Sequence, residues 1–219
     1  MQRYKFNPLL VVPLHKTITV SEDTQVHLWK VTEPEDALSQ GIKLTPQCKD
    51  RLDTMKSEMH RRAFLSIRHL MGLAGYEDKH LFYNEFGKPF LVDGTHISIS
   101  HSHNFTGIIV SKAHEVGIDI ERQREKILRI AHKFTPLQEY RTMANTDALI
   151  LKLTQVWCAK ESLYKIYAQP GLSFLNHITV QDFRLGDAGT TAKIYYKGQQ
   201  SNYQVTFDEF EGFSCAYAF

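Results

Sequence analysis

Two carboxylates stand two residues apart in the segment EVGIDIE, residues 115–121. The alternation of apolar and polar residues predicts a half-buried strand, with Asp119 and Glu121 on one face and Gly117 leaving space beside them. Carboxylates are poor strand formers, and like charges at this spacing repel each other. A cation would relieve that repulsion, and Mg²⁺ takes one or two protein carboxylates while keeping its other positions for water and phosphates. The alternative is a solvated strand face that keeps a sheet soluble.

A second charged group lies in the segment WCAKESLYK, residues 157–165, within a predicted helix. Glu161 and Lys165 are four residues apart and share a face, whereas Lys160 lies about 100° from Glu161 around the helix. Trp157 lies one turn before Glu161 and would anchor the helix in the core. The pattern predicts a third oxygen ligand for a metal, with lysines that contact phosphate. The alternative is an ordinary i,i+4 ion pair worth a few tenths of a kcal/mol.

Together the two segments resemble the signature of the 4′-phosphopantetheinyl transferases: V-G-I-D, then about forty residues, then W-C-x-K-E-S-x-x-K. Either segment alone would be unspecific, but the pair at this spacing is specific. The length of 219 residues is similar to that of the larger, monomeric Sfp-type members. Further matching segments, in chain order, are HRR at 60–62, GKP at 87–89, ISISHS at 97–102, KFTPLQEY at 133–140 and GLS at 171–173.

The resemblance implies an enzyme that transfers the 4′-phosphopantetheine group of coenzyme A (CoA) to a serine of an apo acyl or peptidyl carrier protein. The products would be the holo-carrier protein and 3′,5′-ADP, and the reaction would depend on Mg²⁺ or Mn²⁺. Carriers of fatty-acid, polyketide, nonribosomal-peptide or aminoadipate (lysine) biosynthesis all fit the pattern. The alternative is a non-catalytic module of the same fold that binds CoA or a carrier protein.

The resemblance also implies roles for individual acids and one lysine. Asp119, Glu121 and Glu161 match the metal-binding acids of the family, and Lys165 matches a lysine that contacts the phosphates. Glu139 matches a carboxylate that helps to deprotonate the incoming serine. The general base stays open between Glu139, Glu161 and a water molecule at the metal.

Contacts with CoA are implied mainly in the first half of the chain. Arg61 matches the arginine that binds the 3′-phosphate, with Lys49 as a helper, and a guanidinium fork suits such a phosphate. Pro46 stands where Sfp-type proteins often have a further lysine, so the detail of this recognition stays open. The other residues implied in CoA binding are Lys88, Pro89, Ser100, His101 and Lys160.

Helices and strands must hold these groups in place. Apolar residues recur at spacings of three and four after Thr45-Pro46, which predicts one long helix from this N-cap to Gly72. Thr135-Pro136, with Gln138 as the partner in a capping box, predicts a second helix start. A longer helix is expected over 147–168, and SKAHE at 111–115 is typical of a hairpin turn. Strands are expected at 26–31, 96–100, 106–111 and 115–121, followed by an antiparallel sheet from 178 to the C-terminus.

We therefore expect an α+β fold of two similar α/β halves related by a pseudo-two-fold axis, each with a long helix packed on a small, mainly antiparallel sheet. The two Thr-Pro helix starts suggest this repeat. The first half, residues 1–110, would contact the 3′-phosphate and pyrophosphate of CoA. The second half, residues 111–219, would carry the metal site, the catalytic helix and the carrier contacts.

Composition narrows the classes further. A net charge of only +2 argues against a nucleic-acid partner. The three cysteines, Cys48, Cys158 and Cys215, form neither a CxxC pair nor a disulfide framework. The apolar run LLVVPL is too short to span a bilayer, and no signal-peptide cleavage site follows it. We expect a cytoplasmic monomer without a membrane partner.

Three other classes of site fit the sequence less well. Three histidines, His96, His101 and His103, invite a zinc site, but no cysteine or carboxylate lies near them in sequence. The aromatic residues of the C-terminal strands could stack on bases, although packing within a sheet explains them better at this charge. The glycines form neither a GxGxxG nor a Walker loop, so a P-loop enzyme is disfavoured.

Overall fold

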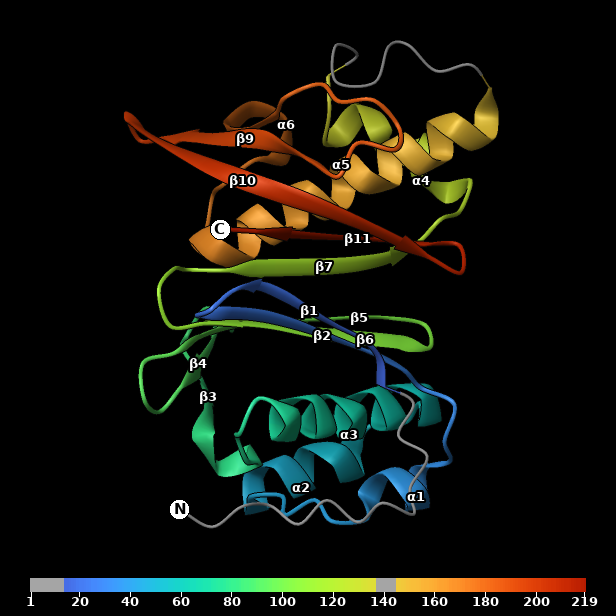
Figure 1. Ribbon diagram of the computed structural model, residues 1–219, viewed down its shortest axis with the longest axis vertical. Helices are drawn as coiled ribbons and strands as arrows, with labels where there is room; N and C mark the ends of the chain where they lie inside the picture. Colours follow the sequence, from blue (N-terminus) through green and yellow to red (C-terminus); the bar gives the residue numbers. More distant parts are fainter. Residues whose placement is uncertain (1–13, 137–144) are drawn as a thin grey trace.

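The computed structural model describes residues 14–136 and 145–219. They form four layers, in which α3, a first sheet, a second sheet and α5 follow one another along the long axis of the molecule (Figure 1). The first sheet has the order β1-β2-β6-β5 and the second β7-β11-β10-β9-β8, and every pairing is antiparallel. The predicted mixture of helices with antiparallel sheets is confirmed. The pseudo-two-fold relation between the halves stays a prediction.

The strands of the first sheet are β1 (Leu14–Ser21), β2 (Thr24–Lys30), β5 (His96–Ser102) and β6 (Phe105–Ser111). Those of the second are β7 (Gly117–Arg122), β8 (Ile178–Val180), β9 (Gly189–Tyr196), β10 (Gln199–Phe210) and β11 (Phe213–Ala218). A small hairpin consists of β3 (Leu81–Tyr83) and β4 (Pro89–Leu91). The α-helices are α1 (Glu35–Ser39), α2 (Pro46–Thr54), α3 (Glu58–Leu73), α4 (Lys126–Ile130), α5 (Thr146–Tyr167) and α6 (Phe174–His177), with 3₁₀ turns at Asp78–His80 and Ala131–Lys133.

The predicted long helix after Thr45-Pro46 is wrong in one respect, because the chain forms two helices there. Thr45 caps α2 by accepting from the N–H of Cys48, and Pro46 is the first helical residue, as predicted. Met55 then turns to extended backbone, and Ser57 caps α3. The apolar spacing continues across the break because both helices pack on the same core, so periodicity alone did not reveal it.

The predicted hairpin at 111–115 is also wrong. Strand β6 pairs with β2 and β5, whereas β7 pairs with β11, so the connection leaves one sheet and enters the other. Every residue of β6 is buried, since α3 covers one face of the first sheet and the second sheet covers the other. Two consecutive apolar strands give the same pattern whether they pair or lie in facing sheets.

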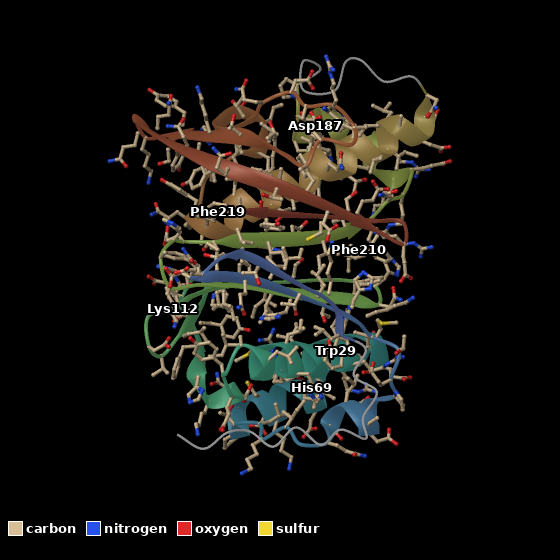
Figure 2. The ribbon with its side chains drawn as sticks, in the orientation of Figure 1. Trp29, His69, Lys112, Asp187, Phe210 and Phe219 are labelled. Carbon is tan, nitrogen blue, oxygen red and sulfur yellow. The ribbon has the colours of Figure 1, made fainter. Side chains whose placement is uncertain are left out.

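Apolar side chains fill three spaces between the layers. Trp29 of β2 stacks on His69 of α3 with ring centroids 5.3 Å apart, in the layer between the first sheet and its helices (Figure 2). The rings of Phe105 and Phe210 pack with their centroids 4.7 Å apart where the two sheets face each other. The third cluster lies between α5 and the second sheet. The two sheets are therefore joined by a continuous apolar layer.

The helix predicted over 147–168 is confirmed as α5. Asn145 caps its start by accepting from the N–H of Ala148, and Ala168 ends it with a left-handed φ of 47°. Its apolar residues Leu153, Val156 and Leu163 are buried. The capping box predicted at Thr135 and Gln138 falls partly outside the described residues.

The space predicted beside Gly117 is occupied by α5, which approaches β7 closely there. A Cβ atom built on Gly117 would overlap the main-chain carbonyl oxygen of Ser162. The helix backbone and the acidic strand are therefore in direct contact at this point.

Gly117→Ala should destabilise the protein by roughly 1–3 kcal/mol, because a methyl group must push the α5 backbone away from β7. Urea unfolding measures the change. Gly72→Ala is the matched control: Gly72 lies in α3, nothing stands within 4 Å of a Cβ placed there, and alanine should be neutral or stabilising. Equal effects of the two changes would contradict the close approach.

Candidate active site

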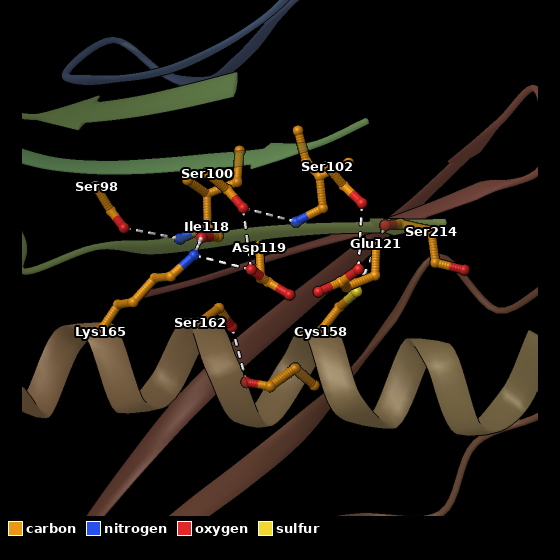
Figure 3. Close-up of polar contacts among 12 residues, drawn as sticks. Ser98, Ser100, Ser102, Ile118, Asp119, Glu121, Cys158, Ser162, Lys165 and Ser214 are labelled. Atoms are coloured by element: carbon orange, nitrogen blue, oxygen red, sulfur yellow. Dashed lines mark hydrogen bonds and ion pairs between the residues drawn. The ribbon is translucent and has the colours of Figure 1, made fainter. Parts of the chain in front are cut away.

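Strand β7 places its acids opposite α5. Ile118 and Ile120 point into the layer between the sheets, and Asp119 and Glu121 lie between β7 and α5 (Figure 3). Asp119 is 5% exposed and Glu121 is half-buried. The predicted alternation is confirmed, and it brings two carboxylates together in a poorly solvated layer.

One oxygen of Asp119 is occupied and the other is not. Its Oδ1 accepts from the hydroxyl of Ser100 at 3.0 Å and from Nζ of Lys165 at 2.8 Å (Figure 3). Its Oδ2 is buried and has no hydrogen-bond partner among the described residues. A buried carboxylate oxygen without a partner is costly, and a cation or donor from a ligand would satisfy it.

Glu161 faces the same acids from α5. The pKa of Glu161 is raised to about 7, mainly because the side chain is buried. The nearby carboxylates of Asp119 and Glu121 raise this pKa further, whereas the ammonium of Lys165 lowers it. Burial also raises the pKa of Glu121, with the Asp119 carboxylate as the next cause. The three acids thus share one electrostatic environment. Within residues 14–136 and 145–219, however, no three His, Cys, Asp or Glu side chains converge closely enough to hold a metal as they stand.

A cavity of about 650 Å³ opens beside this site. Its wall combines α2 and α3, the β3–β4 hairpin, β5 and the C-terminal end of α5, so it lies where the two sheets and their helices meet. Phe64, Tyr83 and Phe86 supply aromatic surface. Its basic side chains are Arg51, His60, Arg68, Lys88, His101 and Lys165. Aromatic and cationic groups in one cavity suit a ligand with a base and phosphates.

Several residues that the sequence assigned to CoA binding line this cavity. Lys88 donates to Glu115 at 2.9 Å and to the carbonyl of Ile166 at 2.6 Å, which links the β3–β4 hairpin to α5. Pro89 and His101 also line it, and the His101 ring packs edge-on against His60. Ser100 instead lies behind the wall, bonded to Asp119.

Other assigned residues lie away from the cavity wall. Arg61 donates to Glu35 at 2.7 Å and to the carbonyl of Met55 at 2.9 Å. Lys160 is fully buried, and its ammonium donates to the carbonyls of residues 174 and 178. Lys49 is exposed on α2 and does not border the cavity. Glu139 lies outside the described residues.

Arg51 is a cavity residue that sequence reasoning missed. Its guanidinium lies 5.8 Å from the ring centroids of both Phe64 and Tyr83, and it has no ion pair within the described parts of the chain. Arg51 precedes Met55 by one helical turn, and both line the cavity. Arg51 and Lys49 lie about 160° apart around the helix, and of the two only Arg51 lines the cavity.

A second cavity of about 510 Å³ borders Glu161 on the side of α4 and α6. Trp157, Phe174 and Lys133 form part of its wall, and Tyr164 borders both cavities. Glu161 therefore lies between the acids of β7 and a separate, largely aromatic recess.

Comparison with known proteins supports the resemblance. Residues 115–218 match the sequence profile of the 4′-phosphopantetheinyl transferase superfamily, which spans β7, α5 and the rest of the second sheet. The C-terminal half of the chain is therefore similar to this superfamily. The predicted resemblance is therefore confirmed there.

A curated relative extends the likeness. The chain is 33% identical over 138 residues to the 4′-phosphopantetheinyl transferase gsp of Aneurinibacillus migulanus. The match covers 61% of this chain and 55% of the relative, so it spans about half of that relative's length. Among the described residues, no helix is long and apolar enough to cross a membrane.

Glu161→Gln should change the pH dependence of stability. Glu161 keeps its proton in the folded protein up to a pKa of about 7, while the unfolded chain releases it near 4.5, so stability is lost as the pH rises through this window. In EDTA, the variant should exceed the wild type by about 1–3 kcal/mol at pH 8, with no such gain at pH 4.5. Urea unfolding at both pH values checks this, and a pH-independent offset would contradict it.

Proposed function

We propose that the protein transfers the phosphopantetheine group of CoA to a serine of an apo carrier protein. The observation that carries the proposal is the buried Oδ2 of Asp119, which has no hydrogen-bond partner among the described residues and faces α5 beside a cavity lined by aromatic and basic groups. The superfamily match over this region and the name of the curated relative support it.

The large cavity would hold CoA. Its volume of about 650 Å³ is within the range of small-molecule and cofactor sites. Phe86 and Tyr83 offer flat surface for the adenine ring, and Lys88 lies in the turn of the same hairpin. The pyrophosphate would then lie toward Lys165 and the acids of β7.

Lys165 can bridge the acids and the phosphates. Its ammonium has three N–H donors, of which one goes to Asp119 and one to the carbonyl of Ile118. The third is available to a phosphate oxygen, and Lys165 borders the cavity. Lys165 would thus hold the pyrophosphate while it stays paired with Asp119.

The donors present fit a divalent cation. Mg²⁺ needs only one or two protein carboxylates when phosphates and water complete its shell, so Asp119 Oδ2 and Glu121, with Glu161 opposite, form a suitable set. When bound, such an ion supplies charge neutralisation for the pyrophosphate as the serine attacks. Mn²⁺ would fit the same oxygens.

The reaction needs a base for the serine proton. The serine oxygen attacks the phosphorus that carries pantetheine, the bond from that phosphorus to the oxygen shared with 3′,5′-ADP breaks, and the hydroxyl proton must leave. Glu161, with a pKa near 7, could accept it at neutral pH and borders the recess from which a carrier serine could approach. Glu139 remains the alternative proposed by the resemblance.

A non-catalytic CoA- or carrier-binding module is the second candidate. Such a module needs the cavity to bind its ligand, but it does not need Asp119, Glu121 or Glu161. The burial of unpaired Asp119 Oδ2 costs stability without any benefit to such a module, which favours the enzyme.

Incubation with CoA, Mg²⁺ and several apo-carrier proteins should add one phosphopantetheine unit to a carrier, detected by mass spectrometry. Asp119→Ala and Glu161→Ala should each abolish transfer while circular dichroism stays unchanged. No mass gain with the wild type, together with CoA binding in calorimetry, would favour the binding module. Retained transfer in either variant would remove that acid from the site.

Arg51→Ala should weaken discrimination between CoA and 3′-dephospho-CoA, because Arg51 is the cavity arginine without an acidic partner in the described residues. Loss of one charge-assisted contact of about 1.5–3 kcal/mol predicts a roughly 10- to 100-fold fall in kcat/KM for CoA and a much smaller one for dephospho-CoA. Lys49→Ala, on the exposed side of the same helix, is the control. If Lys49→Ala or Arg61→Ala alone reduced the discrimination, Arg51 would not be the phosphate ligand.

A further inference from the structure

The two sheets meet along β5 and β7 without sharing backbone hydrogen bonds. Each is the edge strand of its own sheet, and the two strands lie side by side (Figure 1). Three serines at alternate positions of β5, Ser98, Ser100 and Ser102, point from β5 toward β7 (Figure 3). We call them the serine row.

The serine row satisfies the open edge of β7. The hydroxyl oxygens of Ser98, Ser100 and Ser102 accept from the backbone N–H groups of residues 118, 120 and 122 at 3.2, 3.1 and 3.3 Å. Buried N–H groups on a strand edge need such partners. The row thereby fixes the register of one sheet against the other.

Two members of the row also reach the acids. A hydroxyl has one hydrogen to donate and two lone pairs, so an oxygen that accepts from the backbone can still donate elsewhere. Ser100 donates to Oδ1 of Asp119 at 3.0 Å, and Ser102 donates to Oε2 of Glu121 at 3.2 Å. Ser98 makes no carboxylate contact within the described residues.

Each donation occupies one oxygen of its acid and leaves the other for a ligand. The second oxygen of Asp119 is the buried one without a partner. The second oxygen of Glu121 likewise has no hydrogen-bond partner in the described parts of the chain. Because the Cα atoms of both acids are fixed by the sheet, one hydrogen bond to each carboxylate sets which way its free oxygen points.

We propose that Ser102 is a positioning residue for a divalent cation at this site, acting through Glu121 as Ser100 acts through Asp119; this rests on the proposed function. The serine row belongs to β5, outside residues 115–218, which carry the superfamily match. The first half of the chain would therefore set the metal affinity of the second half.

Ser102→Ala should lower the affinity of the protein for Mn²⁺, measured by electron paramagnetic resonance of the unbound ion with CoA absent and present. Loss of a hydrogen-bond partner of a metal ligand typically costs 10- to 100-fold in affinity, so a rise in Kd of about tenfold is expected. Ser102→Cys keeps the shape of the side chain, with a somewhat larger sulfur atom, but donates weakly, and it should show the same direction of change if the alanine variant does not fold.

Ser98→Ala is the matched control. It removes the same kind of bond to β7 but no bond to an acid, so it should lower the unfolding midpoint in urea about as much as Ser102→Ala while Mn²⁺ affinity stays at the wild-type value. Because Ser98 borders the large cavity, the comparison is made on Mn²⁺ binding and unfolding, not on turnover. Wild-type Mn²⁺ affinity in both Ser102 variants, or an equal loss in Ser98→Ala, would overturn the proposal.

The Mn²⁺ measurement separates this proposal from the proposed function. If the wild type binds Mn²⁺ and the Ser102 variants bind it weakly, the positioning role holds even where no carrier protein is modified. If the wild type binds no Mn²⁺ with or without CoA, the positioning role fails, whatever the transfer assay shows.

Discussion

The arrangement of the site depends on one electrostatic constraint: carboxylates from β7 and α5 share a poorly solvated layer with too few cations. Lys165 offsets the charge of Asp119 through one oxygen, but Asp119 Oδ2 remains buried without a partner, and the pKa of Glu161 rises to about 7. A fold selected for stability alone would replace such acids with apolar residues. These acids lie next to Lys165, which also lines the cationic cavity, and the proposed phosphate chemistry rests on that proximity.

Two close contacts impose that constraint on the fold. Gly117 brings the backbone of α5 against β7, so the helix acids and the strand acids cannot separate. On the other side of β7, serine hydroxyls in place of a partner strand join the sheets. If a partner strand were paired with this edge of β7, its carbonyl groups would accept from the backbone N–H groups in place of the serine hydroxyls. In the observed arrangement, one serine hydroxyl both accepts from a backbone N–H of β7 and donates to a carboxylate. The same serine hydroxyls therefore hold the two sheets together and orient the acids of the site.

The sequence predicted the parts of this site that follow from local periodicity. Alternation placed Asp119 and Glu121 on one strand face, and helical spacing placed Glu161 and Lys165 together on α5. The sequence did not predict which strands pair, because a hairpin of β6 and β7 and two strands in facing sheets have the same local pattern. It also did not predict the break between α2 and α3, because both helices pack on one core and the apolar spacing continues across the break. Sequence can show that a residue is half-buried, but not which element covers it.

The cavity cations illustrate the same limit for function. Arg61 and Lys49 were assigned to CoA because their positions match a motif, yet Arg61 is held by Glu35 and Lys49 lies away from the cavity. Arg51, on the cavity side of α2, has aromatic neighbours and no ion pair with an acid in the part of the chain that the structure describes. An arginine already paired to a carboxylate must break that pair before it binds a phosphate, whereas one over aromatic rings loses little. Binding a phosphate would therefore cost less free energy at Arg51 than at Arg61, and the position of a residue in a motif gives no information on that cost.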